Sequence, residues 1–514
     1  MRRLCKLCHR LLLYCVEAFR HLRYYRRVAT FYVANFGCRA TQADGAAIER
    51  QLRERGLERA EEPAAAGLVV LNTCTVTAAA DQDARAAIRR IHRKNPEAQI
   101  VVTGCYAQRA PQEIAALPGV SQVIGNSHKH QLAQLAVGLL TSDLRQRPAH
   151  STFVPLERLT ADVRGSRSDA RSPIFVSDIF AHTELQAAPV FDAANERTRP
   201  NLKVQDGCDN RCSFCVIPSV RGQSRSLEFG EVIREVKALV GAGYREVVIS
   251  GINLGRWGRD LDGRPQPSVP GKKGQRPTTN GQQPGFEDLV RAILSETELQ
   301  KLRISSVEPM DWSDELIRLM ATSPRIAKHA HVPLQSGSDA VLRRMHRKYR
   351  PWHYREKVEK IRAAMPAAAI GADVMAGFPG ETEAEFEETC RFIGDLPLTY
   401  LHVFTYSARP GTPAAAMGKQ VPIHVARERN RVLRDLASGK KLAFMSGFVG
   451  RRIETITLNI SGADPQGEYT EGLTDNYLPM RVSGNHAANR WIQTRVERVS
   501  EGVLRGIAGQ RLHD

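Results

Sequence analysis

Three stretches near the amino-terminal end repeat one order, in which an apolar run is followed by a cysteine and then by a helix-like segment. The runs are 29–34 before Cys38, 68–71 before Cys74 and 100–103 before Cys105. Repeated strand–helix units fold into a parallel sheet. Ligands bind beyond the carboxyl ends of such strands, so we expect the three cysteines to converge there. Converging thiolates favour an iron–sulfur cluster, whereas a lone cysteine after a strand is commonly a small buried apolar residue. Both interpretations stay open from spacing alone.

A second group of cysteines, Cys208, Cys212 and Cys215, has the spacing C-x3-C-x2-C after a strand-like segment at 201–205. A [4Fe–4S] cluster normally takes four thiolates, so a loop with three leaves one iron open to a ligand that is not protein. A structural zinc site would need a fourth Cys or His, and residues 216–222 contain neither. Disulfides are disfavoured because the group has an odd number of cysteines and no export signal precedes it.

The charge of the chain indicates a polyanionic partner. It has 514 residues with 73 basic and 55 acidic side chains, a formal net charge of +18. Nucleic acid is the commonest such partner, although a basic surface can also serve solubility alone. A chain of this length predicts roughly two to four domains.

The sequence predicts no association with a membrane. No stretch approaches the roughly 20 apolar residues that span a bilayer. The apolar run at 11–16 is also too short for the core of a signal peptide. We therefore expect the protein to stay in the cytoplasm, where thiols are reduced.

The cysteine motifs together resemble one enzyme family. The C-x3-C-x2-C loop is similar to the signature of radical S-adenosylmethionine enzymes, and the peptides 37–42, 72–77 and 104–108 resemble the amino-terminal domain of the methylthiotransferases. The resemblance implies two [4Fe–4S] clusters, one bound by Cys38, Cys74 and Cys105 and one by Cys208, Cys212 and Cys215.

The same resemblance implies how the two clusters share the reaction. The first cluster would donate the methylthio sulfur, and the second would cleave S-adenosylmethionine to the radical that activates an unreactive C–H bond. A second S-adenosylmethionine would supply the methyl group. The resemblance also implies an electron donor such as flavodoxin or ferredoxin.

From about residue 200, strands and helices alternate, as in the predicted helix 228–242 followed by the strand 246–250. Successive units of this kind predict a full or partial barrel of the TIM type. Similar segments of radical S-adenosylmethionine enzymes contact that cofactor, and the resemblance gives this role to Gly251, Glu308, Gln335 and Gly377. An ordinary strand-to-helix turn would look the same. His331, at a strand end, is a candidate general base or a residue that only caps or packs.

The chain is therefore expected to be an α/β protein in several parts. We predict an unstructured basic leader at 1–28, a methylthiotransferase amino-terminal domain with a parallel sheet at 29–140 and a linker at 141–197. A radical S-adenosylmethionine core at 198–443 and a small β-barrel at 444–514 follow. The leader contains Cys5, Cys8 and Cys15; a frayed basic arm and a metal site are both compatible with it.

The predicted final barrel resembles the TRAM domain, a small RNA-binding barrel, and so implies tRNA as a partner. Arg451, Arg452 and Arg481 are candidates to hold phosphates there. The aromatic residues either stack on bases or pack in the core; they are Tyr469, Tyr477 and Trp491.

Within the family, the resemblance is nearest to enzymes acting on N6-threonylcarbamoyladenosine at position 37, in the tRNA anticodon stem-loop. It includes the peptides 72–77, 204–208, 331–337 and 347–349. Isopentenyladenosine 37 and an aspartate of a ribosomal protein are alternative substrates. A protein that is not an enzyme, but an iron–sulfur RNA-binding or redox-sensing protein, is a further alternative.

Overall fold

The computed structural model describes residues 29–146, 173–181, 185, 198–261 and 284–509. The predicted leader, with Cys5, Cys8 and Cys15, lies outside these residues. The described chain divides into two compact units. The first contains most of the amino-terminal sheet, and the second contains 177–514 together with Phe36–Ala47 and Thr73–Asp83.

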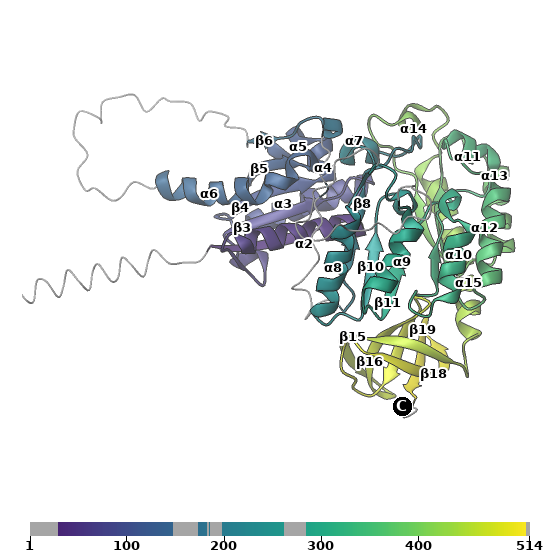
Figure 1. The fold of residues 1–514 in the computed structure, drawn as a ribbon. Coiled ribbons are helices and arrows are strands. Elements are labelled where there is room, and N and C mark those ends of the chain that lie inside the picture. Colours follow the sequence, from purple (N-terminus) through teal and green to yellow (C-terminus); the bar gives the residue numbers. More distant parts are fainter. Residues whose placement is uncertain (1–28, 147–172, 182–184, 186–197, 262–283, 510–514) are drawn as a thin grey trace, which may run out of the picture. The chain divides into compact units, whose positions relative to one another are not determined.

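The first unit is built on a parallel sheet, as the repeated strand–helix pattern predicts (Figure 1). Its strands have the order β2-β1-β3-β4-β5-β6, and the pairs β1–β2, β1–β3, β4–β5 and β5–β6 are parallel. The strands are β1 (Thr30–Asn35), β2 (Glu58–Arg59), β3 (Leu68–Thr73), β4 (Gln99–Gly104), β5 (Val120–Gly125) and β6 (Ile174–Phe175). The helices are α2 (Arg39–Glu54), α3 (Ala78–Lys94), α4 (Cys105–Arg109), α5 (Pro111–Ala115) and α6 (Leu132–Gln146).

Apolar side chains explain why these elements pack together. β3 is buried along its whole length, and Phe31, Ile48, Leu52 and Val101 belong to one buried cluster. The predicted linker 141–197 contributes to this unit, since α6 extends to Gln146 and β6 pairs with β5.

The second unit contains a partial barrel, as the alternation after residue 200 predicts. Two parallel sheets, β7-β10-β11 and β12-β13-β14, are joined by an isolated parallel bridge between Ser306 and His331. The strands are β7 (Asn201–Lys203), β10 (Glu246–Ser250), β11 (Lys301–Ile304), β12 (His329–His331), β13 (Ala369–Ala376) and β14 (Tyr400–Thr405).

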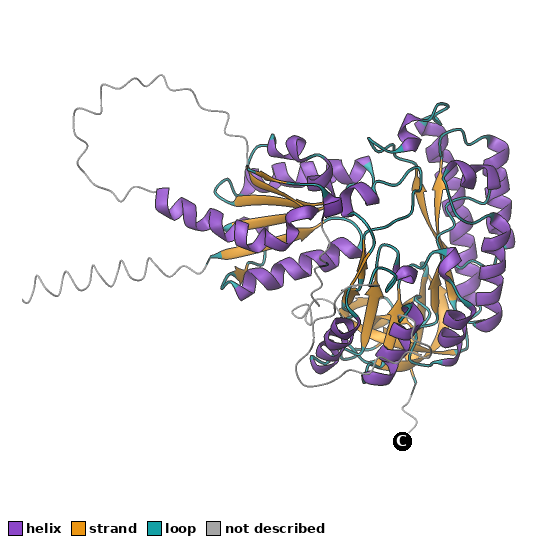
Figure 2. Cartoon of the chain, turned by 45° about the horizontal axis from the view of Figure 1, so that its top comes forward, coloured by secondary structure: helices purple, strands orange, loops and turns teal. Residues whose placement is uncertain are grey.

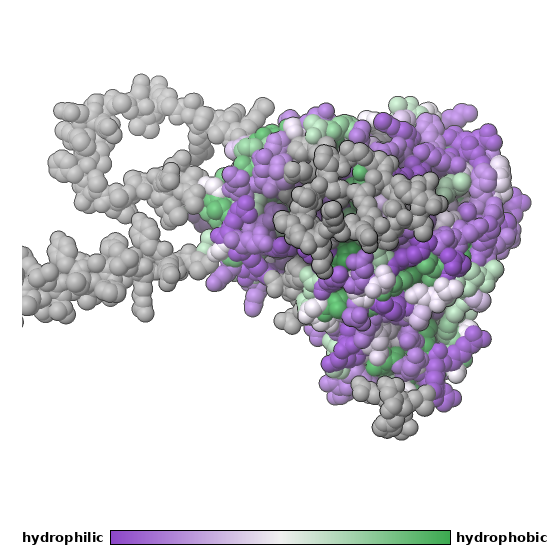
Figure 3. Space-filling view, viewed as in Figure 1, coloured by the Kyte–Doolittle hydropathy of each residue, from purple (hydrophilic) through white to green (hydrophobic). Residues whose placement is uncertain are grey.

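Helices lie outside these barrel strands (Figure 2). They are α8 (Phe229–Gly241), α9 (Phe286–Glu296), α10 (Asp314–Thr322), α11 (Asp339–Arg344), α12 (Pro351–Ala364), α13 (Glu383–Asp395) and α15 (Ile423–Ser446). Shorter elements are α7 (Ile217–Arg221), α14 (Pro413–Ala416) and the antiparallel pair β8 (Gln205–Asp206) and β9 (Arg225–Ser226). The surface over α11 and α13 is largely hydrophilic (Figure 3), as expected for helices that turn their apolar side to the barrel.

A small closed barrel follows α15, which confirms the predicted small barrel. Its strand order is β15-β16-β17-β19-β18. The strands are β15 (Arg452–Asp464), β16 (Gly467–Thr474), β17 (Pro479–Ser483), β18 (Trp491–Ser500) and β19 (Val503–Ala508). The pattern at 477–482 predicts a strand that begins at Tyr477, but that residue lies in the β16–β17 turn with a left-handed φ of 70°. No strand was predicted from the sequence for β16.

Over the residues that the structure describes, every helix is too short or too polar to cross a bilayer.

Candidate active site

The three-cysteine loop opens on a cavity of about 550 Å³, whose lining residues all belong to the second unit. Cavities of ~300–1,000 Å³ are typical of small-molecule sites. The lining includes Cys38, Arg39, Cys208, Cys212, Cys215, Gly251, Glu308, His329, His331, Gln335, Arg347, Asp373, Tyr400, His402, Phe404 and Tyr477. The structure thus brings Cys38 to the same cavity as the loop cysteines, although about 170 residues separate them in the sequence.

Polar groups surround the loop sulfurs. The Asn210 backbone N–H donates to Cys208 Sγ at 3.4 Å, and Arg347 Nη1 donates to Cys212 Sγ at 3.2 Å. Burial raises the pKa of Cys208 to about 11 and that of Cys215 to about 12. These thiols therefore need a bound cation to become thiolates at neutral pH, which is how metals engage cysteine.

The donor set suits an iron–sulfur cluster better than a single ion. Among the described residues, no group of three or more His, Cys, Asp or Glu side chains has the spacing of ligands to one metal ion. In a [4Fe–4S] cluster each thiolate binds a different iron, so the sulfurs stand further apart. Half-buried soft donors with N–H groups directed at sulfur match that group.

Cys38 and Cys74 lie on two loops that touch. Gly37 has a left-handed φ of 106°, and a Cβ there would lie 2.5 Å from Cys74 Cβ. Glycine is therefore required both by the backbone conformation and by the close approach. Cys38 is exposed and Cys74 is buried.

A buried ion network fixes the segment that carries Cys38. Lys203 Nζ contacts Asp44 and also Asp206 Oδ2, the latter at 2.8 Å. Arg221 bonds to Asp44 at 3.1 Å and to Asp206 at 2.9 Å. Burial alone would raise the pKa of Asp206, but Arg221 and Lys203 outweigh burial and lower that pKa below its usual range. The start of α2 is thereby bound to the strand that leads into the cysteine loop.

A second buried pair fixes the segment that carries Cys74. Arg409 Nη1 contacts Asp81 Oδ2 at 2.7 Å and the Thr75 carbonyl at 3.1 Å. Thr75 Oγ1 donates to Asp81 at 2.6 Å. These contacts join the loop after β3 to the segment that follows β14.

Cys105 begins α4 directly after β4 and is buried. Asn126 Nδ2 donates to its Sγ at 3.6 Å. The strands that precede the three amino-terminal cysteines, β1, β3 and β4, are neighbours in the sheet. Each cysteine therefore follows the carboxyl end of one of three adjacent strands, as the spacing predicts.

Three of the four predicted cofactor contacts line the cavity: Gly251, Glu308 and Gln335. Gln335 has a left-handed φ of 67°, and strain of this kind in a residue other than glycine is concentrated at functional sites. Glu308 forms an ion pair with Arg347.

Gly377 is placed differently. Its N–H donates to Glu381 Oε2 at 2.7 Å, and a Cβ on it would lie 2.4 Å from Cβ of Ala426, a residue of α15. Gly377 therefore allows β13 and α15 to approach closely, and a contact to the cofactor stays a prediction.

Another part of the cavity lining is cationic and aromatic. Arg39 Nη2 donates to Tyr477 Oη at 3.0 Å, and His329 Nε2 lies 2.6 Å from Tyr400 Oη. Burial, reinforced by nearby Arg303, lowers the pKa of His329 well below its usual value, so this histidine is neutral at pH 7. His331 lies 3.3 Å from Asp373.

Several of the predicted RNA contacts of the final barrel have partners within the protein. Arg481 lies over the ring of Tyr469 at 4.6 Å and is 3.7 Å from Asp464. Lys301 Nζ lies 5.0 Å from the ring of Trp491. Tyr477 belongs to the cavity.

Sequence reasoning missed Asp44, Lys203, Arg221, Arg347 and Arg409 as parts of the site. Their distinguishing property is a buried charge with a partner far along the chain, and no local pattern records that property.

Two family models match the chain. Residues 30–125 match the family described as Uncharacterized protein family UPF0004, and residues 202–393 match the Radical SAM superfamily. The partial barrel with its three-cysteine loop is thus that of a radical S-adenosylmethionine enzyme.

Relatives with printed functions cover nearly the whole chain. Threonylcarbamoyladenosine tRNA methylthiotransferase MtaB of Bacillus subtilis is 34% identical, over 89% of this chain and 91% of the relative. The tRNA-2-methylthio-N(6)-dimethylallyladenosine synthase of Erythrobacter litoralis is 33% identical, over 83% of this chain and 86% of the relative. The chain belongs to the radical S-adenosylmethionine tRNA methylthiotransferases, which are enzymes of sulfur-group transfer that use S-adenosylmethionine and [4Fe–4S] clusters.

Among solved structures, the radical S-adenosylmethionine methyltransferase TsrM from Kitasatospora setae has a TM-score of 0.49 and 15% identity. The match covers 76% of this chain and 77% of that chain. This likeness is too weak to bear on function.

Proposed function

We propose that the protein methylthiolates C2 of N6-threonylcarbamoyladenosine at position 37 of tRNA. In this proposal, Cys38, Cys74 and Cys105 hold one [4Fe–4S] cluster, and Cys208, Cys212 and Cys215 hold the other. The observation that carries the proposal is the cavity, where Cys38 and the three-cysteine loop share one space with the cationic and aromatic lining.

The lining supports the threonylcarbamoyl substrate in particular. That modification ends in a carboxylate and a hydroxyl group, whereas a dimethylallyl group is wholly apolar. Arg39 offers a guanidinium to the carboxylate, and Tyr400 and His331 offer polar atoms nearby. An apolar substituent would leave such groups desolvated without a partner, which is how a polar site rejects an apolar analogue.

Different residues of this chain would have different roles in the reaction. The six cysteines hold the clusters; when bound, these groups supply the electron that cleaves S-adenosylmethionine and the sulfur that is transferred. Glu308, Gln335 and Gly251 would orient S-adenosylmethionine in the cavity. The buried ion networks around Asp44 and Arg409 fix the Cys38 and Cys74 loops, which limits the distance over which the reacting groups must meet.

The second candidate substrate is dimethylallyladenosine 37, because relatives of that printed function are 32–33% identical to the chain. Membership in an enzyme family sets aside the iron–sulfur RNA-binding or redox-sensing alternative.

The proposal includes partners and domain limits. The protein would receive electrons from a flavodoxin or ferredoxin and act in the cytoplasm, where tRNA is modified. The domain limits 29–140, 198–443 and 444–514 and the TRAM identity of the closed barrel belong to the proposal, supported by the strand order of the sheets in each part.

Two measurements test the proposal. Mass spectrometry of tRNA nucleosides from a strain without the gene is expected to show loss of the methylthio group from threonylcarbamoyladenosine alone. The purified, reconstituted enzyme is expected to modify an anticodon stem-loop that carries threonylcarbamoyladenosine and to leave the dimethylallyl counterpart unmodified. The reverse preference would replace the proposed substrate with the second candidate.

A further inference from the structure

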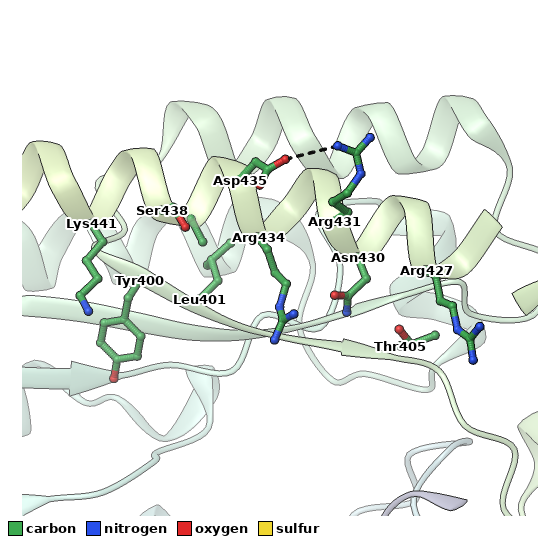
Figure 4. A pocket seen from close by; sticks show the side chains of 11 residues that line it. Tyr400, Leu401, Thr405, Arg427, Asn430, Arg431, Arg434, Asp435, Ser438 and Lys441 are labelled. Atoms are coloured by element: carbon green, nitrogen blue, oxygen red, sulfur yellow. Dashed lines mark ion pairs between the residues drawn. The ribbon is translucent and has the colours of Figure 1, made fainter. Parts of the chain in front are cut away.

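Helix α15 and strand β14 border an open groove of about 720 Å³, separate from the cavity that holds the cysteines. Arg427, Arg434 and Lys441 line it (Figure 4). They are spaced by seven residues, close to two turns of a helix, so they form one row along α15. In Figure 4 their side chains extend to the same side of the helix, toward β14.

These three cations differ from their neighbour Arg431 in their ion pairing. Within the part of the chain that the structure describes, neither Arg427 nor Arg434 nor Lys441 forms an ion pair, and both arginines are exposed. Arg431 of the same helix behaves differently, since it contacts Glu428 at 2.5 Å and Asp435 at 4.0 Å. Neighbouring cations without anionic partners repel one another, and a bound polyanion relieves this repulsion.

The groove and the cavity share one lining residue. Tyr400 at the start of β14 lines both spaces. Further along the strand, His402 and Phe404 line the cavity, whereas Leu401 and Thr405 line the groove. This is the alternation of a strand whose two faces serve two different spaces. A ligand held in the groove therefore lies along the other face of a strand that also lines the site.

We infer that this groove binds the phosphates of the tRNA strand that adjoins the modified nucleoside. The inference rests on the proposed function. It places the sugar–phosphate backbone of the tRNA in the groove while the base that is modified occupies the cavity. Seven helical residues span about 10 Å, which matches roughly three nucleotides of a stacked strand. Each cation of the row can thus meet a separate phosphate.

The same charges could instead attract an acidic protein, such as a flavodoxin that delivers electrons. RNA is favoured because the cations stand in a row along a groove that shares Tyr400 with the cavity, and a flexible strand fits such a row. The experiment below separates the two partners.

The test compares two triple variants of the full reconstituted enzyme. The first is Arg427→Gln, Arg434→Gln, Lys441→Gln. The control is Arg234→Gln, Arg318→Gln, Arg343→Gln, which removes the same charge from three exposed arginines on α8, α10 and α11. Affinity for a modified anticodon stem-loop is measured as a function of salt. Reductive cleavage of S-adenosylmethionine without RNA is measured in parallel, with dithionite and with reduced flavodoxin.

We expect the groove variant to bind the stem-loop about fiftyfold more weakly at about 0.15 M salt, with the salt slope reduced by about 2, as three lost contacts to a single strand require. The control should bind like the wild type, and cleavage with dithionite should be unchanged in both variants.

Other outcomes overturn the inference in distinguishable ways. If the groove variant keeps the affinity and salt slope of the wild type, the groove does not hold RNA. If in addition only flavodoxin-driven cleavage falls, the groove serves an acidic redox protein. If the wild type itself neither binds nor modifies the stem-loop, the proposed function fails first.

Discussion

At the scale of single residues, two arginines that line the cavity have different surroundings and different expected roles. Arg347 is almost wholly buried and joins Cys212 to the predicted cofactor contact Glu308. Burial would lower the pKa of Arg347, but Tyr349, Glu308 and Cys212 outweigh burial and raise it, so the guanidinium stays charged. Arg39 is only half buried and faces the part of the cavity that we assign to the substrate.

Replacing Arg347 by methionine is expected to make the Cys208 cluster harder to reduce. An N–H group and a positive charge directed at a cluster sulfur stabilise the reduced, more negative state. The reduction potential, followed by electron paramagnetic resonance during a redox titration, should therefore become more negative, and cleavage of S-adenosylmethionine should slow. Arg347→Lys keeps the charge and should recover part of the shift. An unchanged potential in Arg347→Met would show that this contact does not influence the reduction potential of the cluster.

Replacing Arg39 by methionine is expected to weaken use of the threonylcarbamoyl substrate selectively. A hydrogen bond to a charged group contributes about 1.5–3 kcal/mol, so kcat/KM should fall by roughly 10- to 150-fold. Cleavage of S-adenosylmethionine without RNA should not change.

Tyr477→Phe is the matched control for that variant, because it removes only the partner of Arg39. Equal losses in the two variants would mean that Arg39 acts through Tyr477, and no loss in either would remove Arg39 from recognition.

At the scale of elements, buried charges position the two cysteine loops on the second unit. Asp44 of α2 forms ion pairs with both Lys203 and Arg221, which lie far from it in the sequence. All three side chains are almost fully buried. Buried ion pairs contribute little net stability when complete, but removing one partner leaves an uncompensated charge.

Asp44→Asn is therefore expected to destabilise the protein by about 3–5 kcal/mol. Urea unfolding and the rate of proteolysis within 36–47 are the measurements. Glu54→Gln is the control, since it changes the same charge on the same helix at an exposed pair with Arg50 and should cost less than about 1 kcal/mol. If Asp44→Asn and the control behave alike, the network does not hold the Cys38 segment.

The elements themselves could be predicted because their patterns are local. The strand 246–250 was predicted with the bounds that β10 has, and the three cysteines each follow a strand. The Asp44 and Arg409 networks could not be predicted, because their partners lie between 159 and 334 residues apart along the chain. The strand predicted to begin at Tyr477 was wrong for a related reason. An aromatic residue beside a strand pattern suggests a strand, whereas this one lies in a turn and contacts Arg39, which is distant in the sequence.

At the scale of the whole molecule, the proposal requires two clusters with separate tasks in one chain. Six cysteines in two groups predict about eight irons per reconstituted chain. Cys74→Ala removes a ligand of the first group only and should reduce the count to about four. Because Cys208, Cys212 and Cys215 are intact, this variant should still cleave S-adenosylmethionine reductively, yet it should transfer no methylthio group.

Two further variants make that division of labour testable. Cys212→Ala should lose both activities, since the open iron belongs to its cluster. Cys390→Ala removes a half-buried thiol of α13 that lies outside the cavity lining, so it should keep about eight irons and both activities. Methylthiolation that survives in Cys74→Ala would contradict the assignment of the sulfur to the first cluster. Loss of cleavage in that variant would mean that the two clusters depend on each other, because the Asp81–Arg409 ion pair joins the loop carrying Cys74 to the segment that follows β14.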